Sequence, residues 1–340
     1  MTTLLALDSF KGCLTAPEAV DAAASALLCG DALRLPLSDG GEGFTECLVS
    51  ALGGVFRTAS IHDPLGRPLR ARYGLVQAGK TAVLETASAC GITLLKPGER
   101  DPLRTSSYGT GELIQEAVRQ GVDEVWIGLG GTATMDCGAG LLRALGPIPS
   151  GVRFHAFYDT GIPLMTAPAL YGPQKGADAA GVRELESRFL RQVQAWKTAY
   201  GVDADDLPGA GAAGGIGAAL AVCLGAEMHE GIGAVLEAVR FRERVEACQL
   251  VITGEGKADR QTLTGKVPFG VLQATRRYAP GVPVVLLAGK VEDREELRAG
   301  GFDAIIQITP DNQLDGNYLE KSIARENIRR AVQDLPYFRD

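Results

Sequence analysis

The feature that most constrains the fold is the alternation of short apolar runs with helical patterns along most of the chain. "TLLALDS" at residues 3–9 indicates a buried strand, and "TAPEAVDAAASALL" at 15–28 is typical of a helix. Thr15 and Glu18 have the spacing of a capping box, and Pro17 lies in the first turn, where its missing amide is tolerated. This alternation predicts an α/β protein with largely parallel sheets.

Similar strands return near the C-terminus in "CQLVITGEG", "VPVVLLAGK" and "FDAIIQITP". A length of 340 residues agrees with two domains. We therefore expect a discontinuous doubly wound domain built from residues 1–75 and 241–340, with a second α/β domain inserted at 76–240. Within the insert, apolar residues recur at helical spacing and predict the core face of a surface helix: Val182, Leu185, Phe189, Val193 and Trp196.

Composition excludes several classes of protein. The net charge of −7 argues against a general nucleic-acid binder, and no apolar run is long enough to span a bilayer. The seven cysteines show no CxxC spacing, which favours reduced thiols, and we expect no signal peptide before the first strand. We expect a cytoplasmic protein without membrane or nucleic-acid partners. The histidines His62, His155 and His229 show no metal spacing, which argues against zinc.

A glycine-rich stretch, "GLGGTATMDCGAGLL" at 128–142, directly follows the apolar run Val125-Trp126-Ile127. Glycines let a backbone approach an oxyanion closely, and the amides that begin the next helix point at that charge. The alternative is a tight turn whose glycines only satisfy backbone geometry. The stretch alone does not decide between these interpretations.

Five loops beside predicted strands combine carboxylates suited to Mg²⁺ with lysines suited to anionic oxygens, which are the parts that phosphoryl transfer requires. As alternatives, Asp8 could simply end a strand, and Lys175 and Lys266 could be solvated. The acidic and basic residues of these loops, with one serine, are Asp8, Ser9, Lys11, Asp39, Glu42, Asp136, Asp159, Lys175, Glu255, Lys257, Asp259 and Lys266.

The segment "GAGAAGGIGAAL" at 209–220 matches a dinucleotide fingerprint in its glycine spacing. However, the polar "DADDLPGA" precedes it where the fingerprint needs a strand, so the dinucleotide interpretation fails. A nucleotide-facing helix start or a close helix packing fits better. The acidic residues Asp203, Asp205 and Asp206 indicate an exposed loop. The absence of GxxxxGK[ST] excludes a P-loop kinase.

Seven segments resemble, in order, the signature loops of the class I glycerate kinases over residues 4–335: "DSFKGCLTAPEA", "SDGGEG", "SYGTGELI", "GGTATMDCGAG", "YGPQKGA", "PGAGAAGGIGA" and "TGEGKADRQTLTGK". The resemblance implies ATP-dependent, Mg²⁺-requiring phosphorylation of D-glycerate, usually to 2-phosphoglycerate. It also implies two α/β domains, one of them flavodoxin-like and discontinuous, with a cleft between them.

With the resemblance, our hypothesis assigns roles to the loop residues. Catalysis is assigned to Asp159, Asp136 and Lys11. Substrate binding is assigned to Asp8, Ser9, Lys11, Asp39, Glu42 and Lys266. Nucleotide binding is assigned to Gly130, Gly131, Thr132, Thr134, Lys175, Gly214, Gly215 and Glu255. Metal binding is assigned to Asp136, Asp159 and Asp259.

The sequence departs from the family pattern in the inserted domain. Met135 and Cys137 stand where the family usually has Asn and Gly, Gly161 replaces a second aspartate, and the chain is short between 146 and 152. Other functions stay open: a kinase of another small hydroxy acid, a glycerate 3-kinase, a flavin-binding redox protein or a non-catalytic metabolite-binding relative. The chain is expected to be a monomer or homodimer whose partners are D-glycerate and ATP.

Overall fold

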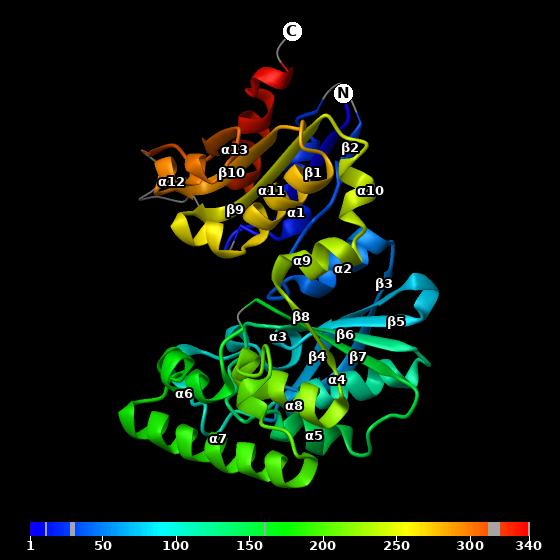
Figure 1. The fold of residues 1–340 in the computed structure, drawn as a ribbon, viewed down its shortest axis with the longest axis vertical. Coiled ribbons are helices and arrows are strands. Elements are labelled where there is room, and N and C mark those ends of the chain that lie inside the picture. Colours follow the sequence, from blue (N-terminus) through cyan, green and yellow to red (C-terminus); the bar gives the residue numbers. More distant parts are fainter. Residues whose placement is uncertain (11, 28–30, 160, 312–319, 339–340) are drawn as a thin grey trace. The chain divides into compact units, whose positions relative to one another are not determined.

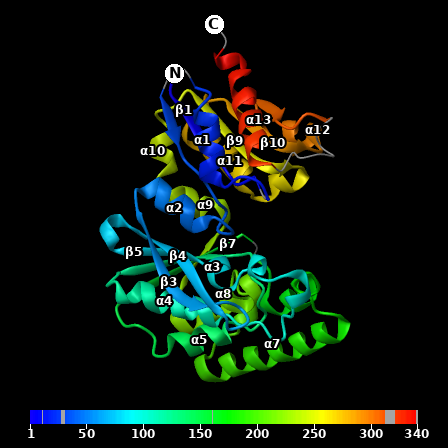
Figure 2. The same cartoon turned by 180° about the vertical axis from the view of Figure 1, so that it is seen from behind.

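A computed structural model describes residues 1–10, 12–27, 31–159, 161–311 and 320–338. The chain forms two compact units (Figures 1 and 2). The first unit contains residues 1–39, 46–51 and 232–340, and the second contains residues 40–45 and 52–231. Among the described residues, no helix has both the length and the apolar character needed to cross a membrane.

In the first unit, both ends of the chain contribute to one parallel sheet of order β11-β10-β9-β1-β2. This is the 2-1-3-4-5 order of flavodoxin-like doubly wound sheets, which confirms the predicted class of fold. In Figure 1 the blue β1 lies beside the yellow β9. The parallel register of these two strands sets Leu5 opposite Ile252. The strands are β1 (Thr3–Leu7), β2 (Ala32–Arg34), β9 (Leu250–Ala258), β10 (Val284–Val291) and β11 (Ala304–Gln307).

Helices cover both faces of this sheet. The apolar sides of α1 and α13 pack in one cluster with β1, β9 and β10, whereas α11 contacts the same three strands separately from that cluster. The predicted capping box begins α1: the Thr15 side chain accepts from the backbone N of Glu18. The helices are α1 (Ala16–Ala24), α2 (Phe44–Leu52), α9 (Gly231–Ala238), α10 (Phe241–Val245), α11 (Val267–Tyr278), α12 (Arg294–Ala299) and α13 (Lys321–Gln333).

The second unit holds a mixed sheet of order β3-β4-β5-β6-β7-β8, in which β3 and β4 form an antiparallel hairpin and β5 to β8 run parallel. Its strands are β3 (Val55–His62), β4 (Pro68–Val76), β5 (Thr81–Glu85), β6 (Glu124–Leu129), β7 (Arg153–Tyr158) and β8 (Glu227–Glu230). Its helices are α3 (Ala87–Cys90), α4 (Tyr108–Arg119), α5 (Ala139–Leu145), α6 (Ala167–Tyr171), α7 (Ala179–Tyr200) and α8 (Ile216–Leu224).

Strand residues alternate between the two faces of this sheet, as the period of two requires. On β7, Phe154, Ala156 and Tyr158 join the main core with α4, α5 and α8, whereas His155 and Phe157 do not belong to that cluster. The predicted surface helix is confirmed as α7, with Leu185, Phe189, Val193 and Trp196 buried in a separate cluster, whereas Val182 is only partly buried. This helix is drawn in green along one side of the second unit (Figure 1).

The division into units differs from the expected boundaries at 75/76 and 240/241. In the structure, the boundaries between the two units lie near residues 51/52 and 231/232. The reason is the backbone pairing of β4, which bonds antiparallel to both β3 and β5 and so brings the whole hairpin into the second sheet. The sequence "VFRTASIH" alternates well enough to indicate a strand, but nothing in it specifies the sheet to which the strand pairs.

Candidate active site

A pocket of about 440 Å³ opens at the end of β6 and β7, within the second unit. That volume lies in the usual range for small-molecule sites. It gathers residues from three of the motifs singled out in the sequence. They are Ile92, Arg100, Leu129, Gly130, Gly131, Thr132, Asp159, Tyr171, Gln174, Lys175, Ala212, Ala213 and Gly214.

The glycine-rich turn after β6 forms one wall of this pocket. Gly131 has a φ of +62°, and a Cβ on Gly130 would lie 2.9 Å from the Cα of Gly41, so side chains are excluded at both positions. The buried Thr86 stabilises the turn, because its Oγ1 lies 3.2 Å from the carbonyl oxygens of both Gly128 and Gly130. The turn is therefore a backbone-lined wall that a negatively charged ligand can approach closely.

Lys175 is the buried cation of the pocket and not a solvated lysine. Its side chain comes from a 3-10 turn, Pro173–Lys175, and the residue is only 6% exposed. The Nζ donates to Thr132 Oγ1 at 3.1 Å and to the carbonyl oxygen of Thr134 at 3.0 Å. Burial lowers the pKa of Lys175 to about 8, although the charges of Cys90 and Asp136 act in the opposite direction. Within the described residues, two of its three N–H bonds are used, which leaves one for a ligand.

The segment 209–220 provides a second wall. Ala213 and Gly214 have φ values of +53° and +68° just before α8, and a Cβ on Gly214 would lie 1.9 Å from the carbonyl oxygen of Thr134. Gly215 precedes α8 in the left-handed region and approaches the Cα of Cys137. The segment is thus both a helix start that lines the pocket and a close packing between loops.

Asp159 directly follows β7, is exposed, and lines the same pocket. It shares the pocket with Lys175 and with the glycine-rich turn. A carboxylate in this position can bind a cation or accept a proton from a substrate hydroxyl.

Asp136 has a different environment from the one expected for a metal ligand. Its Oδ2 accepts from the backbone N and the Oγ of Ser107 and from the N of Gly140, and its Oδ1 accepts from the N of Gly138. These donors lie at the N-terminal ends of α4 and α5, and Asp136 does not line the pocket. The carboxylate therefore fixes the glycine-rich turn relative to two helices.

The two residues that flank Asp136 are buried. Met135 packs in the cluster that includes α7, and Cys137 has a φ of +50°. That left-handed conformation suits the glycine that the family pattern carries at this place better than it suits cysteine. Burial, together with the charge of Asp136, raises the pKa of the Cys137 thiol well above its usual range, so the thiol is neutral and acts as a packing residue.

Glu85 is a charged residue of this region that the sequence analysis missed. It ends β5, and its Oε2 is buried without a hydrogen-bond partner in the described part of the chain, while Ser88 Oγ donates to its Oε1 at 3.3 Å. Burial raises the pKa of Glu85 to about 6, assisted by the charge of Glu42 and opposed by the N–H groups of Thr45 and Gly43. Its position as the last residue of a buried strand was the signal that could have identified it.

The raised pKa of Glu85 gives a testable dependence of stability on pH. The folded-state pKa of about 6 exceeds the ordinary 4.5, so the folded state holds this proton more tightly than the unfolded state. The free energy of unfolding should therefore decrease by up to about 2 kcal/mol as the pH rises from roughly 4.5 to 7. Glu85→Gln cannot titrate and should lack this decrease.

Urea unfolding between pH 5 and 8 measures the effect of Glu85. Both tryptophans, Trp126 and Trp196, lie in the second unit, so their fluorescence reports on its unfolding. Glu184→Gln is the matched control. Arg188 lowers the pKa of this exposed glutamate, so replacing Glu184 cannot abolish the decrease in the free energy of unfolding that Glu85 causes. A wild-type slope retained in Glu85→Gln would show that another group is responsible.

Four further predicted residues, Asp8, Ser9, Glu255 and Lys266, lie in the first unit, in or next to the strands of its parallel sheet. Asp8 follows β1 and is buried, with its Oδ1 accepting from the N of Ser9 at 2.6 Å. The backbone N of Asp8 donates to Gly254, next to the buried Glu255 of β9. Glu255 accepts from Thr262 Oγ1 at 2.6 Å and lies 3.7 Å from Lys266 Nζ.

The predicted site residues also include Asp259, Asp39, Glu42 and Lys11. Asp259 caps a short 3-10 helix, Arg260–Thr264, through a bond from the N of Gln261, and it lies 3.4 Å from Lys257 Nζ. Asp39 lies at the end of the first segment of the first unit and Glu42 in the glycine loop of the second. Lys11 lies outside the described residues.

The comparisons with known proteins agree over the whole chain. The model of the glycerate kinase family matches residues 3–150 and 147–336. The glycerate kinase of Halalkalibacterium halodurans is 37% identical, with 91% of each chain covered. The glycerate 2-kinase of Escherichia coli K12 is 36% identical, with 98% of this chain and 97% of that protein covered.

A solved structure supports the same relationship. The crystal structure of a candidate glycerate kinase 2 from Salmonella typhimurium LT2 has a TM-score of 0.82 and 35% sequence identity, covering 98% of this chain and 96% of the other. Identity at this level over both units, together with a family model that spans nearly the entire sequence, shows more than a shared fold. The chain belongs to the glycerate kinase family of enzymes.

Proposed function

We propose that this enzyme transfers the γ-phosphoryl group of ATP to a hydroxyl of D-glycerate and forms 2-phosphoglycerate. The observation that carries the proposal is the pocket of the second unit, where a buried lysine, a glycine-rich turn and an exposed aspartate lie together. Phosphoryl transfer needs charge neutralisation at the phosphates and a group that positions the attacking hydroxyl. The pocket offers side chains for both tasks.

In this proposal the nucleotide phosphates bind beside Lys175 and the glycine-rich turn. Lys175 supplies a desolvated positive charge, which interacts more strongly with a phosphate than a solvated lysine would. Gly130, Gly131 and Gly214 line this pocket without side chains, so the phosphates can approach their main-chain atoms. Thr132 and Thr134 hold the ammonium group in place through its two hydrogen bonds.

Asp159 is our candidate for the group that orients or deprotonates the glycerate hydroxyl, and it also suits Mg²⁺. Oxygen ligands from one or two carboxylates, completed by phosphate oxygens and water, are typical of Mg²⁺ in kinases. When bound, Mg²⁺ neutralises phosphate charge. Asp136 fits this metal poorly, since its carboxylate already accepts four hydrogen bonds from helix termini. Asp259 is likewise engaged as a cap.

Glycerate binding is assigned to the polar residues at the carboxyl edge of the first sheet. Ser9 and Lys266 would bind the substrate carboxylate, together with Lys11. Asp8 and Asp39 would accept hydrogen bonds from the substrate hydroxyls. Glu255 would keep Lys266 oriented, because the two side chains form an ion pair at 3.7 Å.

The test of this function is a measurement of ADP release with several acceptors. D-glycerate should support turnover, whereas L-glycerate, tartronate and hydroxypyruvate should support much less. Phosphorus NMR of the product then distinguishes 2-phosphoglycerate from 3-phosphoglycerate. Activity confined to another hydroxy acid would show that D-glycerate is not the substrate. Formation of 3-phosphoglycerate would contradict the proposal that the 2-hydroxyl is phosphorylated.

We further expect an absolute requirement for a divalent cation, because the triphosphate adds several negative charges beside the carboxylate of Asp159. Excess chelator should abolish turnover, and Mg²⁺ added beyond the chelator should restore it. The titration should be run at constant ionic strength, so that a loss of general screening is not mistaken for a loss of the metal. Undiminished turnover in chelator would contradict the metal assignment.

A further inference from the structure

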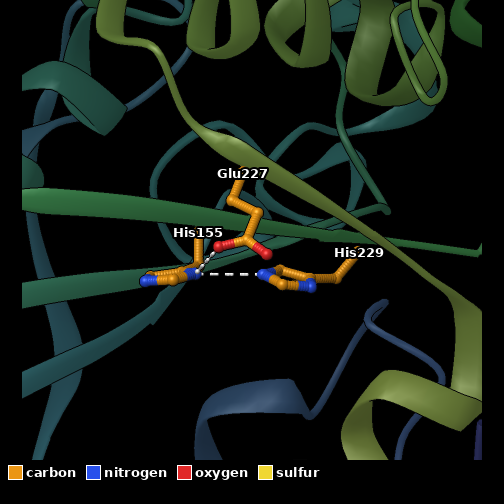
Figure 3. Close-up of side chains that lie close together, drawn as sticks. All are labelled: His155, Glu227 and His229. Atoms are coloured by element: carbon orange, nitrogen blue, oxygen red, sulfur yellow. Dashed lines mark hydrogen bonds and ion pairs between the residues drawn. The ribbon is translucent and has the colours of Figure 1, made fainter.

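Two histidines that lie 74 residues apart in sequence meet on neighbouring strands of the second unit. His155 is on β7, and Glu227 and His229 are on β8, where the parallel register sets His155 opposite Glu227 and Phe157 opposite His229. Figure 3 shows the Nδ1 of His155 facing both the Nε2 of His229 and the carboxylate of Glu227. One ligand atom from each residue lies within 4.8 Å of the other two.

The distances between these atoms are close to the separation of two ligand atoms that bind the same metal ion. His155 Nδ1 is 3.0 Å from His229 Nε2 and 3.5 Å from Glu227 Oε2. Zinc binds imidazole nitrogen at about 2.0–2.1 Å, so two ligands of a tetrahedral zinc ion lie about 3.4 Å apart. Small side-chain rotations would give both separations that value.

The hydrogen bonding of His155 provides a second, independent observation. Its Nε2 is buried and has no hydrogen-bond partner in the described part of the chain, although Glu124 Oε2 lies 4.0 Å away. If His155 only donated from Nδ1 to His229, Nε2 would be a buried acceptor beside a carboxylate, which is unfavourable. A metal on Nδ1 places the proton on Nε2 instead, directed at Glu124, in the carboxylate–histidine–metal arrangement that is common in proteins.

The surroundings would retain a bound ion while leaving it accessible. His229 stacks on Phe157 at a ring distance of 4.8 Å, and His155 contacts the edge of Trp126 at 6.3 Å. Both histidines are half-buried, whereas the side chain of Glu227 is 68% exposed. The aromatic rings fix the orientations of the imidazoles, and the exposed side provides the path for entry and for a water ligand.

We propose that His155, Glu227 and His229 bind one divalent transition-metal ion, with zinc preferred and water as the fourth ligand. Two imidazoles and one carboxylate select such an ion over Mg²⁺, whose ligands are oxygens. The site joins β8, the edge strand of its sheet, to β7. Beyond β8 the chain passes into the first unit at Ile232, so the ion would stabilise the last strand before that crossing.

The experiment measures zinc binding without nucleotide or glycerate, so its outcome is independent of the proposed kinase activity. The metal-free full-length protein is titrated with zinc chloride by calorimetry in wild-type form and as Glu227→Gln, His229→Asn and His62→Asn. The wild type should bind one high-affinity zinc ion per chain. Glu227→Gln and His229→Asn should each weaken binding at least about tenfold, since even the residues that orient a metal ligand have effects of that size.

His62→Asn is the matched control, because it removes the remaining histidine of the same unit, which pairs with Glu112 instead. Its zinc affinity should equal that of the wild type. Quenching of tryptophan fluorescence by Ni²⁺ is a second readout that depends on proximity to Trp126, and it should disappear in His229→Asn. Circular dichroism checks that each variant is folded. Because Glu227 is exposed, Glu227→Gln should disturb the fold less than His229→Asn.

Either of two results would overturn the proposal. One is a wild-type protein that binds no zinc at stoichiometric concentrations. The other is zinc binding that is equally tight in the Glu227 and His229 variants, which would assign the ion to cysteines or to the acidic loops.

Discussion

Replacing Asp159 by asparagine is expected to lower turnover by about 10²–10⁴-fold, the range over which positioned general bases contribute. The amide has nearly the same size and keeps an oxygen toward the pocket, but it can neither accept the hydroxyl proton nor carry a charge. Asp159 is exposed and follows the end of β7, so the fold should be unaffected. Turnover and nucleotide affinity should be measured separately, with circular dichroism to confirm folding.

The two roles proposed for Asp159 give different patterns. If it acts on the hydroxyl, the rate falls while the affinity for nucleotide and the Mg²⁺ concentration needed for half-maximal rate stay constant. If it binds the metal, that Mg²⁺ concentration rises as well. A variant with wild-type turnover would exclude both roles.

Asp203→Asn is the matched control for Asp159, with the same chemical change in the same unit. Asp203 pairs with Lys197 at 2.8 Å and caps a short turn, a task that asparagine also performs. Its rate should change by less than about twofold, as is usual for surface substitutions away from a site. If this variant were the slower of the two, the distinction between site loops and surface loops would be wrong at that position.

Replacing Lys175 by methionine should weaken nucleotide binding strongly, by about 10²-fold or more, because a hydrogen bond between charged groups in a desolvated site contributes about 1.5–3 kcal/mol and the lost charge adds to this. Methionine approximately fills the buried volume. It leaves Thr132 and Thr134 without their donor, so stability must be measured alongside. Lys197→Met, at an exposed lysine of the same unit, should leave nucleotide affinity unchanged.

The lowered pKa of Lys175 adds a pH dependence to this prediction. With a pKa of about 8 in the free protein, the ammonium loses its proton as the pH rises through that value. A bound phosphate stabilises the charged form, so nucleotide affinity should be highest below pH 8 and fall above it. Lys175→Met should bind weakly at every pH and show no such fall. A wild-type affinity that stays constant from pH 7 to 9.5 would contradict the assignment of Lys175 as the phosphate-binding charge.

Much of the architecture follows from patterns that neighbouring residues carry. The alternation of apolar runs and helical patterns predicted two parallel-rich sheets, and the capping box at Thr15 and Glu18 correctly marked the beginning of α1. The glycines near 130 and 214 pointed to close backbone approaches, and both segments line the pocket with Lys175 and Asp159. These features are local, because the period of a strand, a cap or a left-handed turn depends on residues a few positions apart.

Pairing between strands and burial depend on residues that are distant in sequence, so only the tertiary structure decided them. The hairpin of β3 and β4 joins the second sheet through the pairing of β4 with β5, which no local pattern in the sequence specifies. The sequence offered Asp136 as a metal ligand, whereas two helix termini that converge on that carboxylate make it a cap.

It also missed Glu85, whose raised pKa arises from burial. It argued against zinc because His155 and His229 are far apart, although the register of β7 and β8 sets their nitrogens 3.0 Å from each other. Sequence spacing specifies the conformation of a segment, whereas the register between segments determines which side chains share a site.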